Sequence, residues 1–141
     1  INPKYLPDIP LPHTILSVGN VTEDCQDCDY IIIVTPHQFF AKMIPDMRGH
    51  LAPNATAITL IKGVTVTGDR IELITDAVQE GLGIPCGALM GANIANDIAR
   101  GDFCESTIAF EDEAVGQLWY PIFNNKNFRI KVIKDVVLTQ L

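Results

Sequence analysis

Three short stretches put residues that can bind anions or stabilise charge directly after apolar runs. They are VTPHQF (34–39), LIKGV (60–64) and LMGANIANDIA (89–99). Free N–H groups at a helix start bind anions, and a lysine ammonium group stabilises negative charge that develops on an oxygen atom. In an open sheet of parallel strands, ligands bind outside the carboxyl ends of the strands. The three stretches therefore form one candidate site if the apolar runs are neighbouring parallel strands.

The first stretch combines a helix start with an aromatic side chain. Thr35 as N-cap, Pro36 at the first helical position and Gln38 match a Thr-x-x-Gln capping box. A well-capped helix explains these residues without any ligand. Alternatively, the helix N-terminus attracts an anion and Phe39 provides a flat apolar wall for a ring. His37 is interpreted as a helix-start residue and is assigned no proton chemistry.

The second stretch ends an apolar strand with Lys62, and Gly63 lets the chain turn there without side-chain obstruction. When an alcohol is oxidised by loss of a hydride, its hydroxyl proton must leave as well. An ammonium group close to that oxygen stabilises the charge that develops on it. The alternative is a solvated lysine that only marks the end of a strand.

The third stretch has small residues after its strand, Gly91 and Ala92, as a close approach of backbone to a ligand requires. Asn93 either caps the helix that follows or points its amide at a substrate hydroxyl. Small-residue turns after apolar strands are common, so this stretch alone does not decide between the two.

Alternating strands and helices must position these stretches. Continuous apolar runs such as DYIIIVT are typical of strands buried on both faces, and helical spacing of apolar residues separates them. We predict strands at 14–18, 29–35, 56–61, 85–90, 104–109 and 128–133, a short helix or turn at 22–28, and helices at 36–48, 70–80, 94–99 and 112–123. The residues between Lys62 and Gly68 are predicted to be loop. The pattern favours a doubly wound α/β domain with a mostly parallel sheet, and leaves open whether late strands are antiparallel.

Length and charge exclude several classes of protein. The chain has 141 residues, 48% of them hydrophobic, with a mean hydropathy of +0.21, which suits one packed domain. The net charge of −7 argues against nucleic acid as a partner. The longest apolar run is far shorter than the roughly 20 residues that span a bilayer, so no membrane segment is expected. A small basic group is interpreted as a solvated strand face: Lys126, Arg129, Lys131, Lys134.

The four cysteines do not form a metal site by their spacing. Cys25 and Cys28 make a lone CxxC, whereas Cys86 and Cys104 belong to no pair. A structural zinc site needs four ligands, and a thioredoxin-like motif follows a strand rather than preceding one. We therefore predict reduced, structural cysteines and no metal.

Glycine patterns give no phosphate-binding loop within these residues. GLGIPCG (81–87) leads from a helix to a strand, although a dinucleotide fingerprint must lead from a strand to a helix. SVGN (17–20) has the right direction but a single glycine. The chain by itself is therefore an incomplete Rossmann-type domain.

Taken together, the motifs resemble the NAD-dependent glycerol-3-phosphate dehydrogenases of the eukaryotic cytosolic type. The stretches that carry the resemblance are KYLP (4–7), VTPHQF (34–39), GHLAPNATAITLIKGV (49–64), LGIP (82–85), LMGANIA (89–95), FCESTIAF (103–110) and NFRIKV (127–132). They occur in the family's order and cover nearly the whole chain. The bacterial branch of the family is less similar around LIKGV and GANIA, so the resemblance favours NAD over NADP as cofactor.

The resemblance implies an oxidoreductase that interconverts sn-glycerol 3-phosphate and dihydroxyacetone phosphate with NAD(H). It implies that Lys62 is catalytic and contacts cofactor and substrate. Phe39, Ala95 and Pro36 are then cofactor contacts, and Asn93 is a substrate contact. It also implies a cytoplasmic location and a homodimeric full-length enzyme.

The resemblance further implies that residues 1–141 are the central and C-terminal part of an NAD-binding domain. The family's glycine-rich first βα unit precedes the matched stretches, and its second catalytic lysine and helical substrate domain follow them. Residues 135–141 (DVVLTQL) depart from the family's pattern, and TVTGDRIEL (65–73) replaces a more acidic loop. We therefore expect the isolated chain to be inactive, to bind NAD weakly or not at all, and to expose apolar sheet surface.

Two other functions stay open. The chain could be a non-catalytic α/β binding domain derived from that enzyme. It could also belong to another β-hydroxyacid-type dehydrogenase that shares the fold.

Overall fold

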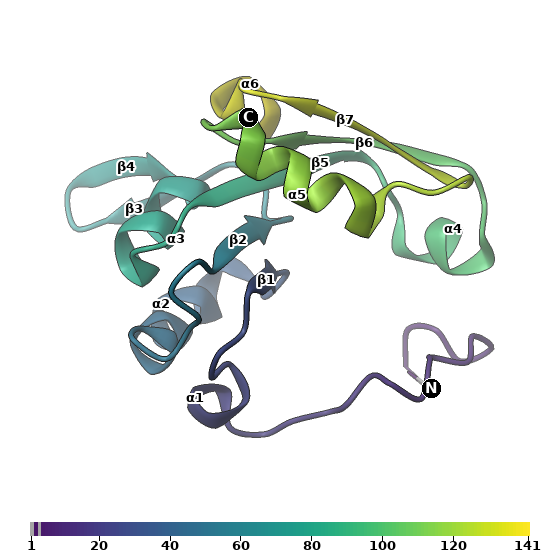
Figure 1. The fold of residues 1–141 in the computed structure, drawn as a ribbon, viewed down its shortest axis with the longest axis horizontal. Helices are drawn as coiled ribbons and strands as arrows, with labels where there is room; N and C mark the ends of the chain where they lie inside the picture. The colour runs from purple at the N-terminus through teal and green to yellow at the C-terminus, as the bar shows by residue number, and fades with distance from the viewer. Residues whose placement is uncertain (1, 3) are drawn as a thin grey trace.

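The fold is built on a five-stranded sheet. A computed structural model describes residue 2 and residues 4–141, with the side chains of residues 37, 38, 40, 41 and 67 outside the description. The sheet has the order β1(Tyr30–Ile33), β2(Thr56–Thr59), β5(Cys86–Ala92), β6(Cys104–Ala109), β7(Phe128–Ile133) (Figure 1). The first three strands are parallel, β6 is antiparallel to β5, and β7 is parallel to β6.

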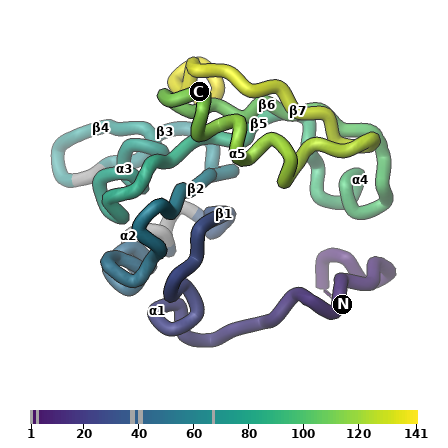
Figure 2. Tube along the Cα trace, in the orientation of Figure 1, coloured from purple at the N-terminus to yellow at the C-terminus, as the bar shows by residue number. Residues whose placement is uncertain are grey.

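Helices lie before, between and after these strands. They are α1(Val21–Asp24), α2(His37–Met47), α3(Ile74–Leu82), α4(Ala95–Arg100), α5(Glu113–Phe123) and α6(Val136–Gln140). A separate hairpin, β3(Val64–Thr67) and β4(Arg70–Leu73), lies between β2 and α3. Figure 2 shows the yellow C-terminal segment with α6 returning to the sheet, where it packs against β5 and β6.

Two apolar clusters lie on opposite faces of the sheet. Consecutive strand residues point to opposite faces, and Ala57 belongs to one cluster while Ile58 belongs to the other. The first cluster includes Ile74 and Val78 of α3, and the second includes Trp119 of α5. Helices therefore cover both faces, as a doubly wound α/β fold requires.

Trp119 is the largest fully buried side chain and fixes α5 on the sheet. Its indole N–H donates to the hydroxyl of Thr56 over 3.1 Å, so its one polar group is paired. Phe110 and Phe123 stack on its ring, and Tyr30 meets it edge to face at 5.0 Å. This aromatic group joins α5 to β1 and β2 at the centre of the domain.

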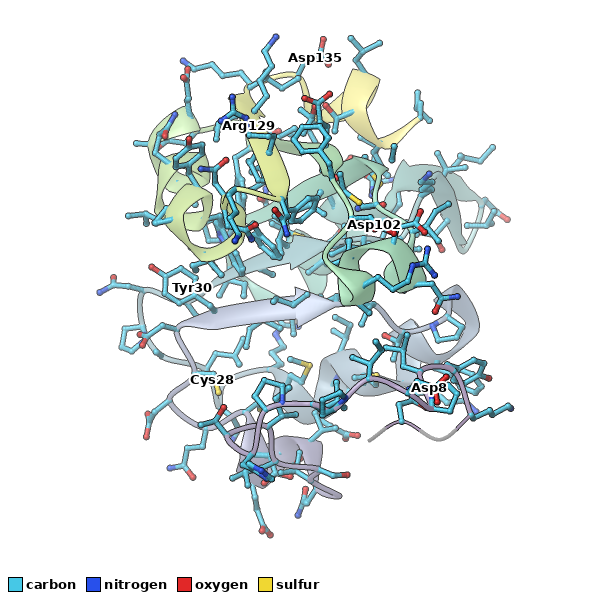
Figure 3. The ribbon with its side chains drawn as sticks, turned by 90° about the vertical axis from the view of Figure 1, so that its right-hand side faces the viewer. Asp8, Cys28, Tyr30, Asp102, Arg129 and Asp135 are labelled. Atoms are coloured by element: carbon cyan, nitrogen blue, oxygen red, sulfur yellow. The ribbon has the colours of Figure 1, made fainter. Side chains whose placement is uncertain are left out.

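Strand β1 is an edge strand with an apolar outer face. Ile31 and Ile33 point into the first cluster, whereas Tyr30, Ile32 and Val34 are 45%, 48% and 62% exposed. Figure 3 shows Tyr30 on β1 and Arg129 on β7 at opposite ends of the sheet. The expected exposure of apolar sheet surface is thus observed at β1. No helix in the described part of the chain is long and apolar enough to cross a membrane.

Most predicted elements are confirmed, and the mostly parallel doubly wound sheet is among them. The predicted strands 104–109 and 128–133 have the observed bounds of β6 and β7. Pro45 lies inside α2, which nevertheless continues to Met47, close to the predicted end at residue 48.

The prediction of a loop up to Gly68 and a helix from residue 70 is wrong. Residues 64–73 form a hairpin, in which Thr67 pairs with Arg70 across the two-residue turn Gly68–Asp69. Gly68 has a φ of 62°, which such tight turns favour. The alternating pattern VTVT–GD–RIEL explains the hairpin, and Ile71, which the helical spacing of the predicted helix 70–80 includes, is 75% exposed on it.

The predicted strand 14–18 is absent, and a C-terminal helix was missed. Ile15, Leu16 and Val18 are exposed and lie beside no strand, so the segment lacks the partner that a strand needs. The missed helix, α6, begins after Asp135, whose carboxylate accepts from the Leu138 N–H over 2.8 Å. Its β-branched residues hide the helix in the sequence.

We predict that Ile32→Lys reduces self-association of the chain without unfolding it, because a charge on an exposed edge strand disfavours strand-to-strand pairing. Ile33→Lys is the matched control: Ile33 is 7% exposed and a charge there would be buried without a partner. Sedimentation velocity measures association, and circular dichroism measures folding. A folded Ile33→Lys variant, or an unfolded Ile32→Lys variant, would contradict this assignment of faces.

Candidate active site

The three junctions lie at one edge of the sheet, the edge formed by the carboxyl ends of its parallel strands. Strands β1, β2 and β5 are parallel, and the register places Ile33, Thr59 and Ala88 in one row across them. Pro36 and Lys62 each follow that row by three residues, and Asn93 follows it by five. Since parallel strands have their carboxyl ends at the same edge, the predicted site residues of all three junctions lie there.

The antiparallel strand β6 brings further residues to this edge. Ala92 at the end of β5 pairs with Glu105 at the beginning of β6, and both are exposed. Phe103, two residues earlier, is 63% exposed. Sequence reasoning left the direction of β6 open, so it did not place these side chains beside the junctions.

At the first junction, the predicted capping box is wrong. Pro36 rather than Thr35 is the N-cap of α2, and no described side chain makes a capping hydrogen bond there. Phe39 lies in the first turn and is 47% exposed, with its N–H donating to the Pro36 carbonyl over 2.9 Å. The side chains of residues 37 and 38 lie outside the described part. An exposed ring therefore stands beside a helix start that no described side chain caps.

At the second junction, Lys62 is exposed, and backbone hydrogen bonds hold the residues beside it. The Leu60 N–H donates to the Ile33 carbonyl over 3.0 Å, which ties the end of β2 to β1. Gly63 has a φ of 88°, and a Cβ there would meet nothing within 4 Å. A glycine is thus required at position 63 by the backbone conformation rather than by lack of space. No hydrogen bond or ion pair of the Lys62 ammonium group is found among the described residues.

At the third junction, Gly91 is required by the sheet itself. Its φ is 155°, and a Cβ there would lie 2.6 Å from the Glu105 carbonyl oxygen and 2.7 Å from Ser106 Cα. The backbone that approaches it is that of β6, so the sheet alone explains a glycine at this position without a ligand. Ala92 is exposed and forms no such contact in the described part.

The predicted capping role of Asn93 is also wrong. Ile94 is the N-cap of α4, and no side chain of the described residues caps that helix. The Asn93 amide makes no hydrogen bond to the rest of the described chain, and Ala95 opens the helix with an exposed side chain. Both residues are therefore accessible at the edge where Lys62 lies.

Cys25, Cys28 and Cys86 precede or begin their strands and lie away from this edge, whereas Cys104 is buried at the beginning of β6, next to Glu105. All four are free, and the described residues contain no group of three or more possible metal ligands. Burial raises the pKa of the Cys25 thiol, and burial together with the negative charge of Asp76 raises that of Cys86. Both effects disfavour the thiolate form of these two cysteines.

A cavity of about 380 Å³ opens beside the candidate site on the neighbouring strands. It shares Gly91 with the third junction, but Lys62, Phe39 and Asn93 do not line it. Its lining residues are Met90, Gly91, Glu105, Ser106, Thr107, Arg129, Ile130 and Lys131.

With this geometry in hand, comparison with known proteins decides the family. A family model described as NAD-dependent glycerol-3-phosphate dehydrogenase N-terminus matches residues 1–116. The chain belongs to that family. The human relative, glycerol-3-phosphate dehydrogenase [NAD(+)], cytoplasmic, is 45% identical over 135 residues, which are 96% of this chain and 39% of the relative. The chain thus spans about 39% of the length of this curated relative.

Solved structures of the family share the fold. The glycerol-3-phosphate dehydrogenase of Dunaliella salina gives a TM-score of 0.89 at 35% identity, covering 96% of this chain and 24% of that one. The Plasmodium falciparum enzyme gives a TM-score of 0.89 at 33% identity, covering 96% and 38%. The sheet is therefore that of the NAD-dependent glycerol-3-phosphate dehydrogenase family, and the predicted Rossmann-type fold is confirmed.

We predict that Gly63→Ala destabilises the domain by about 1–2 kcal/mol, because an alanine at this positive φ is strained. Gly19→Ala is the matched control, since a Cβ at Gly19 also meets nothing within 4 Å but its φ is not positive. Urea unfolding measures the free-energy difference. Equal stability of the two variants would contradict the assigned backbone conformation.

We predict that iodoacetamide at pH 8 modifies Cys28 well before Cys86. The raised pKa of Cys86 leaves less thiolate at that pH, and its side chain is buried, whereas Cys28 is partly exposed. Peptide mass spectrometry follows the two rates, and unfolding in urea should equalise them. Equal rates in the folded chain would contradict the burial of Cys86.

Proposed function

We propose that these residues contribute half of the cofactor cleft and one catalytic lysine to an enzyme that interconverts sn-glycerol 3-phosphate and dihydroxyacetone phosphate. One observation supports this most. In a member of this family, Phe39, Lys62 and Asn93 each follow the carboxyl end of one of three neighbouring parallel strands, β1, β2 and β5. The names of its relatives specify NAD(+) and the cytoplasm, and we extend both to this protein.

The residues at the edge fit part of a dinucleotide. The start of α2 leaves N–H groups that no described side chain caps, and such groups attract phosphate. The exposed ring of Phe39 and the ring of Pro36 follow β1, and the small side chain of Ala95 follows β5, so they offer apolar contact after the strands on either side of β2, which Lys62 follows. NAD, when bound, supplies the hydride acceptor or donor.

Lys62 acts on the oxygen of the reacting carbon. Oxidation of the secondary alcohol removes a hydride from carbon and a proton from oxygen, and a carbonyl forms. The ammonium group is free of partners within the described residues and stabilises the negative charge that oxygen carries during this change. The Asn93 amide, also without a partner there, donates to a substrate hydroxyl or accepts from it.

The remaining parts of the enzyme are proposed to lie outside residues 1–141. A glycine-rich first βα unit would pair with the free edge of β1 and cover Tyr30, Ile32 and Val34, which are exposed. A helical substrate domain would complete the site, and the full-length enzyme would be a homodimer. The coverage of 39% of the human relative supports this division.

The test is a chimera of the human relative that carries residues 1–141 in place of its matching stretch. We expect NADH-dependent reduction of dihydroxyacetone phosphate, and a loss of about 100- to 1,000-fold in kcat/KM for Lys62→Met, because one charge-stabilising donor is removed. Lys134→Met is the control, since Lys134 follows β7 at the opposite edge of the sheet.

Full activity of the Lys62→Met chimera would contradict the role of the lysine. A chimera that folds and binds NADH without turnover would instead favour the alternative, a non-catalytic binding domain. Preference for another β-hydroxyacid over glycerol 3-phosphate would show that the substrate is misassigned.

A further inference from the structure

The last helix ends against the segment that carries Lys62. Gln140, at the end of α6, is 1% exposed although its side chain is polar. Buried amides are retained where their hydrogen bonds are satisfied. The partners of Gln140 come from two elements far from it in sequence, the turn after β2 and the start of α3.

Gln140 holds both peptide groups that flank Lys62. Its Nε2 donates to the Ile61 carbonyl over 3.1 Å, and that carbonyl belongs to the peptide bond before Lys62. Its own backbone carbonyl accepts from the Gly63 N–H over 3.0 Å, and that N–H belongs to the peptide bond after Lys62. One residue therefore restrains the backbone on both sides of the Lys62 Cα atom.

Gln140 is itself held by the first turn of α3. Its Oε1 accepts from the Thr75 hydroxyl over 2.9 Å and from the Thr75 N–H over 3.3 Å. The N-cap of α3, Leu73, makes no side-chain capping bond, so Gln140 pairs a helix N–H that would otherwise lack a partner in this turn. Both ends of the amide are thus used, and the side chain has one orientation.

We propose that Gln140 is a positioning residue for Lys62 in the reaction proposed above, on which this inference rests. A lysine side chain is long and flexible, so its ammonium group is directed only as well as its backbone is fixed. Misplacement of a reacting group by about 1 Å can lower a rate about 100-fold. The three side-chain hydrogen bonds of Gln140 connect the Lys62 turn to the rigid start of α3.

The first experiment uses the 141-residue chain and the Gln140→Met variant, in which an unbranched apolar side chain replaces the amide. Hydrogen exchange at the Gly63 and Thr75 N–H groups should become at least about tenfold faster through local opening. The Ala57 N–H, which donates to Pro85 in the sheet, is the internal control and should not change. Unchanged exchange at Gly63 would overturn the proposal.

Thr75→Val provides a second, milder variant that keeps the helix. It removes the hydroxyl donor to Gln140 but leaves the Thr75 N–H in place. Its exchange at Gly63 should lie between those of the original chain and Gln140→Met. Exchange at the original rate would show that the anchor at α3 does not restrain Lys62, which also overturns the proposal.

The second experiment uses the chimera described above and separates positioning from stability. Gln140→Met should lower kcat about tenfold or more with little change in KM, whereas Leu138→Met, on the same helix and 74% exposed, should change neither. In the Lys62→Met background, Gln140→Met should not lower kcat further, because Gln140 acts through that lysine.

The outcomes distinguish this inference from the proposed function. An additional loss in the Lys62→Met background would show a merely structural role and overturn the positioning role. If Lys62→Met alone leaves the rate unchanged, the proposed function fails, while the exchange data still decide whether Gln140 restrains the Lys62 turn.

Discussion

Parallel pairing of β1, β2 and β5 is the constraint on which the arrangement of this protein depends. It places Ile33, Thr59 and Ala88 in one row, so that every segment leaving these strands starts at the same edge. Residues far apart in the sequence thereby become neighbours. At β1 the burial of one face maintains this register, because a slip by one residue would turn Ile31 and Ile33 from the core to the exposed face.

The segment after β2 must also turn away from the sheet while the backbone on both sides of Lys62 stays fixed. Gly63 provides the positive φ, and the hairpin β3–β4 carries the chain away before α3 returns to the sheet. The turn is held from outside by α6 through Gln140. The backbone of the exposed Lys62 is therefore held by one of the most buried polar residues, Gln140, and this fixes the point from which the flexible lysine side chain extends.

Much of the fold could be predicted because its signals are local. The apolar runs predict β1, β2, β5 and β6, and the junction residues Phe39, Lys62 and Asn93 are found because each lies shortly after such a run. The hairpin at 64–73 was missed because alternating β-branched residues were given less weight than a helical spacing that included Ile71. The predicted caps Thr35 and Asn93 are wrong because the N-cap of each helix is the next residue, Pro36 in α2 and Ile94 in α4.

Gln140 lay beyond sequence reasoning for a different reason. It is 79 residues from Ile61, and the segment that contains it departs from the family's pattern. Only the structure shows that its amide completes both the α3 start and the Lys62 turn. Non-local hydrogen bonds of buried polar residues leave no periodic signal, so they are the features that a single sequence conceals.

The central claim, that one sheet edge forms the cofactor side of the site, is tested most directly by hydrogen-exchange footprinting of the chimera with saturating NADH. We expect protection from exchange to be concentrated at residues 36–39, 62–63 and 93–95, which follow the carboxyl ends of β1, β2 and β5. Protection confined instead to the cavity formed by residues 105–107 and 129–131, with none at the three junctions, would contradict it.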